Sequence, residues 1–401
     1  MESVAFFARR RRPRPSLSHE RRNRPAALVF GQRSYRLLPD GDILTLAVRD
    51  GQTETLLLTP ENGGYTASPL SLGLPGQCPD RRESSGAFAW LDAPSDAPPA
   101  VVTGCPGQLP RRLREATSLP FGKDDISIPE TVRFPLPDGT PGHAFFYPPA
   151  SAAFCVPDGE RPPLLVMAHG GPTARAGEGF SLKVQWWTSR GFAVLDVNYS
   201  GSTGFGRPYR ERLDGQWGVR DVEDCIAAAR FMAESGRIDA GRIAIRGSSA
   251  GGLTVLAALA GSDVFSAGVS LYGVTDLRTL AEETHRFEAH YLDSLVGPWP
   301  EAEAVYRDRS PLLMADKIQA PVLCLQGLDD TVVPPAQARS MVAALRENGL
   351  SCPLVEFSGE GHGFRSEDAV RRAFQLELAF YGRVFGFEPA GVSRAEISEI
   401  F

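Results

Sequence analysis

From about residue 119 onward, short apolar runs that are typical of strands alternate with longer segments that are typical of helices. Such alternation predicts a mostly parallel sheet that is covered by helices on both faces. A hairpin across Pro137-Asp138-Gly139 comes first. The expected strands are 132–136, 144–147, 164–168, 193–197, 242–246, 267–271, 322–325 and 354–357, and the expected helices are 180–190, 219–234, 253–260, 336–347 and 369–384.

The fifth of these strands runs into the sequence Gly247-Ser-Ser-Ala-Gly251, with Ser249 at its centre. This G-x-S-x-G pattern between a strand and a helix is typical of a nucleophile elbow, which holds one hydroxyl exposed on a strained turn. Side chains two residues before and after the serine would collide with the turn, so glycine is required there. The alternative is an ordinary Gly/Ser-rich turn. With eight strands, the elbow indicates an α/β-hydrolase fold.

Two later strand ends carry the partners that a nucleophilic serine needs. Asp329 and Asp330 follow the strand at 322–325, and His362 follows the strand at 354–357. Serine attacks a carbonyl only when a base accepts its proton, and an imidazole oriented by a carboxylate does so near neutral pH. The order serine, aspartate, histidine is that of this fold, so we expect a triad of Ser249, one of these aspartates, and His362.

A glycine loop, His169-Gly170-Gly171-Pro172, follows the strand at 164–168. Glycine backbone at this position presents an N–H to a developing oxyanion, and the residue after the nucleophile presents a second. We therefore expect the N–H groups of Gly171 and Ala250 to form an oxyanion hole. The alternative interpretation of the loop is a plain glycine turn.

These motifs together resemble the prolyl oligopeptidase family of serine peptidases, in its acylaminoacyl-peptidase and dipeptidyl-peptidase-like branch. The resemblance covers about residues 119–388 and implies a peptidase that forms an acyl-enzyme on Ser249. The family pattern H-G-x-x-D-x-x-V-P, laid on Gly327, Val333 and Pro334, selects Asp330, with Asp329 as the alternative. Gln326 stands where the pattern has histidine. The other matching stretches are H-G-G-P at 169–172, N-Y-x-G-S-x-G-x-G at 198–206, G-x-W-G-x-x-D-x-x-D at 215–224, G-x-S-x-G-G at 247–252 and G-H-G at 361–363.

The region before the expected α/β-hydrolase domain has a different character. Residues 26–118 hold short β-type runs separated by turn signals, which predicts an antiparallel, hairpin-rich region. The expected strands here are 27–30, 34–38, 42–48, 54–59, 87–91 and 100–103. This region resembles the last two blades, at four strands each, of the family's N-terminal β-propeller, so we expect a truncated propeller. Residues 1–25 hold eight arginines and few apolar residues, which predicts a disordered tail. We expect the catalytic domain over 119–390 and a C-terminal tail over 391–401.

Composition narrows the classes of partner and compartment. The net charge of −6 gives no reason to expect nucleic-acid binding, and the apolar stretches are far shorter than a membrane span of roughly 20 residues. Six scattered cysteines without C-x-x-C spacing are typical of free thiols, so we expect a cytoplasmic protein. We expect no cofactor and no metal, because the i, i+5 spacing of His285 and His290 does not place both side chains on one helical face.

The resemblance implies a short peptide or acyl-peptide substrate. Tyr272 and Trp217 are candidates for its pocket, although either side chain could equally belong to the core. Two other functions stay open. The same triad would serve an esterase, and an incomplete propeller would suit an inactive remnant. The sequence also leaves an oligomer open.

Overall fold

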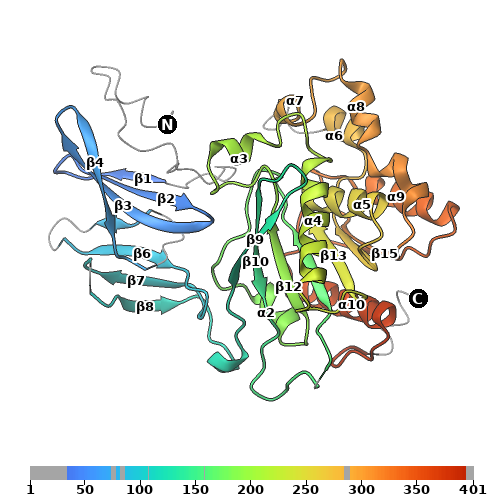
Figure 1. Ribbon diagram of the computed structural model, residues 1–401, viewed down its shortest axis with the longest axis horizontal. Helices are drawn as coiled ribbons and strands as arrows, with labels where there is room; N and C mark the ends of the chain where they lie inside the picture. Colours follow the sequence, from blue (N-terminus) through green and yellow to red (C-terminus); the bar gives the residue numbers. More distant parts are fainter. Residues whose placement is uncertain are drawn as a thin grey trace.

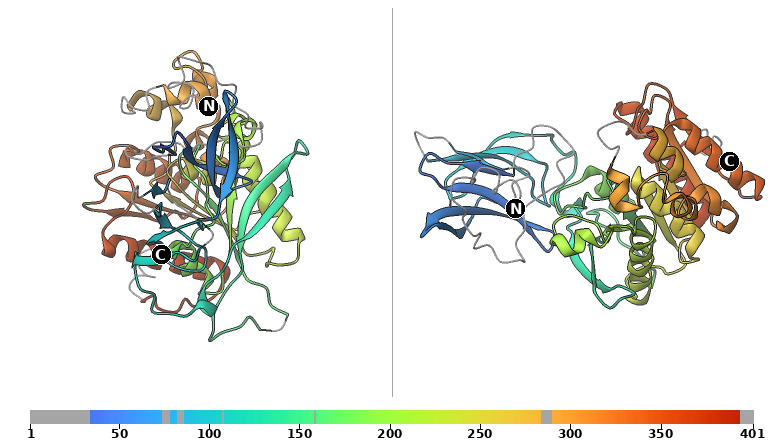
Figure 2. Two further views of the ribbon diagram at one scale, coloured as in Figure 1. Left: turned by 90° about the vertical axis from the view of Figure 1, so that its left-hand side faces the viewer. Right: turned by 90° about the horizontal axis from the view of Figure 1, so that it is seen from above.

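The structure is a computed structural model, and it describes residues 34–73, 78–81, 86–106, 108–157, 159–283 and 290–393. The arginine-rich tail that the sequence predicts, the β-type run at 27–30 and most of the C-terminal tail lie outside these residues. Figures 1 and 2 show two antiparallel sheets at one end of the molecule and a larger α/β body at the other.

The α/β body is built on an eight-stranded sheet in the order β16-β15-β14-β13-β11-β12-β10-β9. The strands from β11 to β16 pair in parallel, whereas β10 pairs antiparallel with both β9 and β12. This is the α/β-hydrolase sheet that the sequence predicts. Its strands are β9 (Glu130–Pro135), β10 (Pro141–Tyr147), β11 (Leu164–Ala168), β12 (Ala193–Asn198), β13 (Ile243–Ser248), β14 (Ala267–Leu271), β15 (Val322–Gly327) and β16 (Leu354–Phe357).

Helices cover both faces of this sheet, because its central strands are apolar on both sides. One face packs against α4 (Arg220–Glu234), α5 (Ala250–Gly261), α9 (Pro335–Glu347) and the 3-10 helix η2 (Pro311–Lys317). The other face packs against α2 (Leu182–Thr188) and α10 (Glu367–Phe385). The remaining helical segments among the described residues are η1 (Lys123–Asp125), α3 (Arg207–Glu211), α6 (Leu277–Glu283), α7 (Tyr291–Leu295) and α8 (Glu303–Asp308).

The N-terminal region forms two four-stranded antiparallel sheets, which agrees with the predicted two blades of four strands. Their shared core includes Leu44, Phe88, Trp90 and Val102. Strands β4, β5 and β8 were not predicted, because β5 has only two residues and neither β4 nor β8 alternates clearly between apolar and polar residues. The first sheet holds β1 (Tyr35–Leu37), β2 (Ile43–Arg49), β3 (Gln52–Glu61) and β4 (Gly64–Leu70), and the second holds β5 (Asp80–Arg81), β6 (Phe88–Asp92), β7 (Ala100–Gly104) and β8 (Arg111–Glu115).

Among the described residues, no helix combines the length and the apolar character that a membrane crossing requires. All six cysteines are free thiols, and Cys78, Cys225, Cys324 and Cys352 are buried.

The strands that matter for function end on one edge of the large sheet, where β11, β13, β15 and β16 run into loops. The carboxyl edge of a parallel sheet is where such folds place their sites.

Candidate active site

Ser249 lies on a sharp turn between β13 and α5, with backbone angles φ +56° and ψ −122°. This conformation is strained for a residue with a side chain, and strain of this kind concentrates at functional sites. The two glycines beside it make the turn possible. A Cβ added to Gly247 would overlap the carbonyl of Gly251, and one added to Gly251 would overlap the carbonyl of Ala168. The predicted elbow is therefore present.

Three side chains that are far apart in the sequence meet at this turn. The Nε2 atom of His362 lies 2.8 Å from the Oγ atom of Ser249, and its Nδ1 atom lies 2.8 Å from Oδ2 of Asp330. Ser249 comes from the β13–α5 turn, Asp330 from the loop after β15, and His362 from the loop after β16. The hydrogen bond from Nδ1–H to the carboxylate leaves Nε2 free to accept the serine proton.

Asp330 is held by its own loop. Its Oδ1 atom accepts hydrogen bonds from the backbone N–H groups of Val332 and Val333, each at 2.9 Å, while its Oδ2 atom faces His362. The side chain of Asp330 is fully buried beside His362, whereas Asp329 is exposed. The structure thus brings Asp330, which the family pattern selects, to the histidine, and not the alternative Asp329.

Gln326, which stands where the family pattern has histidine, also supports this loop. Its side chain is fully buried, and its Nε2 atom donates to Oδ2 of Asp330 at 3.3 Å, to the carbonyl of Val333 at 3.2 Å and to that of Gly327 at 3.1 Å. Three acceptors around one atom identify that atom as the amide nitrogen. Nothing in the sequence pattern indicated this role for Gln326.

Two backbone N–H groups near Ser249 are available to bind an anion. Gly170 packs against Ser249, since a Cβ added to Gly170 would lie 3.5 Å from Cβ of Ser249. Within the described part of the chain, neither Gly171 N–H nor Ala250 N–H donates a hydrogen bond. Ala250 begins α5, and a helix N-terminus favours negative charge.

His169, the other histidine near this loop, has a different environment. Its Nε2 atom lies 2.7 Å from Oγ of Ser202 and its Nδ1 atom 2.8 Å from the carbonyl of Gly170, while its ring stacks on Tyr199 at 4.1 Å. Burial lowers the pKa of His169 to about 4, so this imidazole is neutral at pH 7. Its contacts fix the loop that carries Gly171.

The two pocket candidates occupy different places. Tyr272 lies beside the histidine, with ring centroids 5.1 Å from His362 and 5.3 Å from Phe364. Trp217 is buried in an apolar cluster with Ala250 and Leu253, at 2% exposure, so it packs in the core behind the nucleophile. The structure therefore brings Tyr272 to the site surface and Trp217 to the core.

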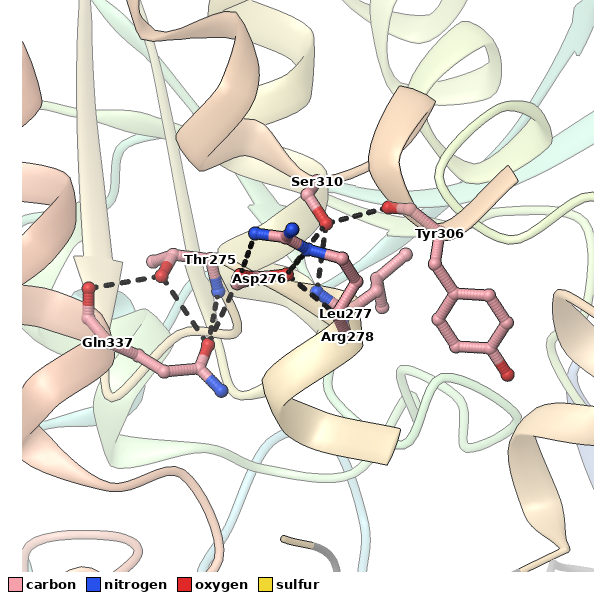
Figure 3. A network of polar contacts seen from close by, with 7 residues as sticks. All are labelled: Thr275, Asp276, Leu277, Arg278, Tyr306, Ser310 and Gln337. Atoms are coloured by element: carbon pink, nitrogen blue, oxygen red, sulfur yellow. Dashed lines mark hydrogen bonds and ion pairs between the residues drawn. The ribbon is translucent and has the colours of Figure 1, made fainter. Parts of the chain in front are cut away.

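The chain after β14 is anchored by a polar network that the sequence did not predict (Figure 3). Gln337 of α9 accepts from the N–H groups of Thr275 and Asp276 at 2.8 and 3.1 Å, and Ser310 accepts from the N–H of Leu277 at 2.9 Å. The preceding residue, Val274, donates its N–H to the carbonyl of Ser249 at 3.2 Å. This network fixes one side of the elbow.

No group of three or more His, Cys, Asp or Glu side chains among the described residues is arranged to hold a metal ion. His290, one of the two histidines considered in the sequence, is exposed and lies 3.0 Å from Asp293. His285 lies outside the described residues.

The chain resembles known proteins in sequence and in structure. The chain is 35% identical over 237 residues to dipeptidyl aminopeptidase BIII of Pseudoxanthomonas mexicana. This match covers 57% of this chain and 34% of that protein. It is 31% identical over 216 residues to an acylamino-acid-releasing enzyme of Arabidopsis thaliana, covering 51% of this chain and 28% of that enzyme. The solved structure of a Mycobacterium tuberculosis puromycin-hydrolyzing peptidase matches with a TM-score of 0.86 and 40% identity, over 94% of this chain and 57% of that one.

The chain thus spans about a third of the length of these curated relatives and 57% of the solved one. The sequence model of the prolyl oligopeptidase family matches residues 178–388, just over half of the chain. The matched region includes Ser249, Asp330 and His362. The chain therefore belongs to the prolyl oligopeptidase family.

Proposed function

We propose that this protein is a serine peptidase that hydrolyses short peptides through an acyl-enzyme on Ser249. The observation that carries the proposal is the pair of 2.8 Å contacts that link Ser249 to His362 and His362 to Asp330. A serine hydroxyl in this arrangement has both a base for its proton and a carboxylate that stabilises the resulting imidazolium.

In the proposed mechanism, Oγ of Ser249 attacks the scissile carbonyl carbon while its proton passes to Nε2 of His362. The carbonyl oxygen becomes an oxyanion, and the N–H groups of Gly171 and Ala250 stabilise it. His362 then returns the proton to the leaving amine, which departs and leaves an ester on Ser249. A water molecule then attacks this ester while His362 accepts a proton from it. His362 passes the proton to Oγ of Ser249, the ester bond breaks, and the acid and the free serine are released.

The names of the relatives guide the choice of substrates. A dipeptidyl aminopeptidase, an acylamino-acid-releasing enzyme and a puromycin-hydrolyzing peptidase all match this chain. Dipeptidyl anilides, acyl-alanyl anilides and puromycin are therefore the first compounds to test. All carry an amide that must be cleaved, which separates a peptidase from an esterase of the same fold.

The test compares these amides with aryl esters on the purified full chain, with the variant Ser249→Ala as the blank. We expect turnover of at least one amide, and we expect Ser249→Ala to reduce kcat about 10³-fold or more. If the parent cleaves the esters but no amide faster than the blank, the protein is an esterase and the peptidase proposal is wrong. Equal amide turnover by parent and variant would exclude Ser249 as the nucleophile.

A further inference from the structure

The tip of the β2–β3 hairpin, in the N-terminal sheet, reaches the loop that carries Gly171. The guanidinium of Arg175 donates from Nη1 to the carbonyl of Gly51 at 2.7 Å and from Nη2 to Oγ1 of Thr53 at 3.0 Å. The N–H of Gly51 in turn donates to the carbonyl of Gly204 at 3.3 Å. A fourth, longer hydrogen bond runs from the N–H of Thr53 to Oε1 of Glu178 at 3.4 Å. Two parts of the chain more than 120 residues apart thus meet through four hydrogen bonds.

Arg175 lies only four residues after Gly171, and the backbone on either side of Arg175 is hydrogen-bonded to the α/β body. The carbonyl of Ala174 accepts from the N–H of Thr203 at 2.9 Å, and the N–H of Ala176 donates to Oδ1 of Asn198 at 2.8 Å. The segment around 198–204 therefore braces one side of the loop, and the hairpin holds both this segment and the Arg175 side chain.

The contact is close enough to require glycine on each side. Gly204 has φ +94°, and a Cβ added to it would lie 2.8 Å from Cγ1 of Val48 and 3.3 Å from Nη1 of Arg175. Gly51 has φ +82°, and an added Cβ would lie 3.0 Å from the ring of Phe205. Such packing transmits the position of the hairpin to its neighbours, because closely packed groups have little room to shift.

The chemistry of Arg175 also indicates a fixed contact. Burial lowers the pKa of this guanidinium, and the nearby charge of Glu178 partly offsets that effect. The partners of Arg175 are a carbonyl and a hydroxyl of the hairpin, so losing them would leave a largely desolvated cation with fewer acceptors. Breaking the contact therefore carries a larger penalty than breaking a solvent-exposed ion pair.

We propose that the β2–β3 hairpin is a positioning element for the loop at residues 169–172, which carries the proposed oxyanion donor Gly171. The hairpin acts through the Arg175 contacts with Gly51 and Thr53. This inference rests on the proposed function, because it assigns a role in catalysis to the N-terminal sheet. An oxyanion donor contributes only when it is held close to its productive position, so a looser loop lowers kcat more than it raises KM. Arg175 and Thr53 are thus positioning residues and do not touch the substrate.

The experiment measures kcat and KM of the full chain on the best amide substrate for Arg175→Gln, Thr53→Val and Thr53→Ser. Serine keeps the hydroxyl that accepts from Arg175, whereas valine keeps the shape without it. The matched control is Arg133→Gln, because Arg133 pairs with Asp50 at 3.0 Å on the same hairpin tip but contacts it from β9. Hydrogen exchange of peptides spanning residues 169–176 is measured on the same proteins.

We expect Arg175→Gln to lower kcat about tenfold and Thr53→Val about threefold, with KM within about twofold of the parent. Thr53→Ser and Arg133→Gln keep kcat within about twofold. Exchange over 169–176 becomes faster in Arg175→Gln and Thr53→Val only. A kcat equal to the parent's in both Arg175→Gln and Thr53→Val would overturn the proposal. So would a loss of kcat in Arg133→Gln as large as in Arg175→Gln, or a rise in KM with kcat unchanged.

The same measurements distinguish an error in the proposed function from an error in the positioning proposal. If the parent cleaves its amides no faster than Ser249→Ala, the peptidase assignment is wrong, and hydrogen exchange alone decides whether the hairpin holds the loop. Exchange over 169–176 that is unchanged in both Arg175→Gln and Thr53→Val would then exclude the contact as a restraint.

Discussion

Single residues set the geometry around Ser249 through buried hydrogen bonds. Asp330 receives two backbone N–H bonds on one oxygen and the imidazole on the other, so its carboxylate has one orientation. Gln326 adds a bond to the oxygen that faces His362. A carboxylate held in this way keeps the imidazole in the tautomer that the proposed mechanism needs.

Replacing Gln326 with leucine removes the amide that bridges Asp330, Gly327 and Val333. We expect Gln326→Leu to lower kcat/KM about tenfold and stability by about 1–3 kcal/mol, because buried acceptors lose their donor. Steady-state kinetics and thermal unfolding measure the two effects. Gln375→Leu is the control, since its one long bond to the carbonyl of Gly391 lies at the surface. A Gln326→Leu enzyme with the parent's kinetics would show that Asp330 needs no such support.

The sequence predicted the order of the three residues, because each follows a strand that ends on the same edge of the sheet. The residues alone did not distinguish Asp329 from Asp330, since which of the two faces inward depends on backbone angles in the loop. The family pattern selected Asp330. The role of Gln326 could not be predicted either. Its partners are two carbonyls and a carboxylate whose positions exist only once the loop after β15 is folded.

At the scale of elements, the elbow works because β13, α5 and the end of β11 approach more closely than side chains would allow. Gly251 lies against the carbonyls of Ala168 and His169, and Gly252 lies against Gly273. A Cβ added to Gly252 would lie 2.5 Å from the Cα of Gly273. The glycines are therefore needed for packing between elements as well as for the turn.

A matched pair of substitutions within α5 tests this point. Gly251→Ala adds a methyl group against backbone atoms that cannot rotate away, and we expect a loss of about 3 kcal/mol in the free energy of unfolding. Gly261→Ala adds the same group where nothing lies within 4 Å, and we expect no loss and a gain of up to about 1 kcal/mol. Chemical denaturation compares the two, and equal stabilities would contradict the packing argument.

The elements that the sequence predicted well are those with a clear hydrophobic signal. Strand β11 has the predicted bounds, because its continuous apolar run, Leu-Leu-Val-Met-Ala, marks a strand that is buried throughout. Strand β8, with the sequence Arg-Arg-Leu-Arg-Glu, is exposed throughout and carries no such signal. The short helices α6, α7 and α8 were also missed, since each spans at most two turns and shows no sustained period.

At the scale of the whole molecule, the N-terminal sheets and the α/β body meet near the β2–β3 hairpin. His143 of β10 lies at this junction, where its ring stacks on Phe205 at 4.3 Å and meets Tyr209 edge-on at 5.2 Å. Burial, with a contribution from the charge of Arg133, lowers the pKa of His143 to about 4.

The domain boundaries, cytoplasmic location and possible oligomer stay predictions.

The low pKa of His143 has a consequence for stability. Between about pH 6.5 and 4 the imidazole binds a proton in the unfolded chain but not in the folded protein. The contribution of His143 to the free energy of unfolding is therefore fully present above pH 6.5 and is lost as the pH drops toward 4. We expect the parent to lose about 1 kcal/mol more than His143→Phe between pH 7 and pH 5, after allowing for solvent screening. Urea denaturation at both pH values measures the difference.

The control for this prediction is His290→Gln, because the His290 side chain is 92% exposed and pairs only at the surface. We expect its pH dependence to match that of the parent. A His143→Phe protein that loses as much stability as the parent between pH 7 and pH 5 would show that His143 is not a buried neutral imidazole.

The most direct test of the whole account is covalent labelling of the nucleophile. The full chain is treated with a fluorophosphonate probe, and the modified residue is located by peptide mass spectrometry. We expect one labelled residue, Ser249, with labelling lost in Ser249→Ala and retained in the neighbouring variant Ser248→Ala. Modification of another serine, or labelling of Ser249→Ala at the parent's rate, would contradict it.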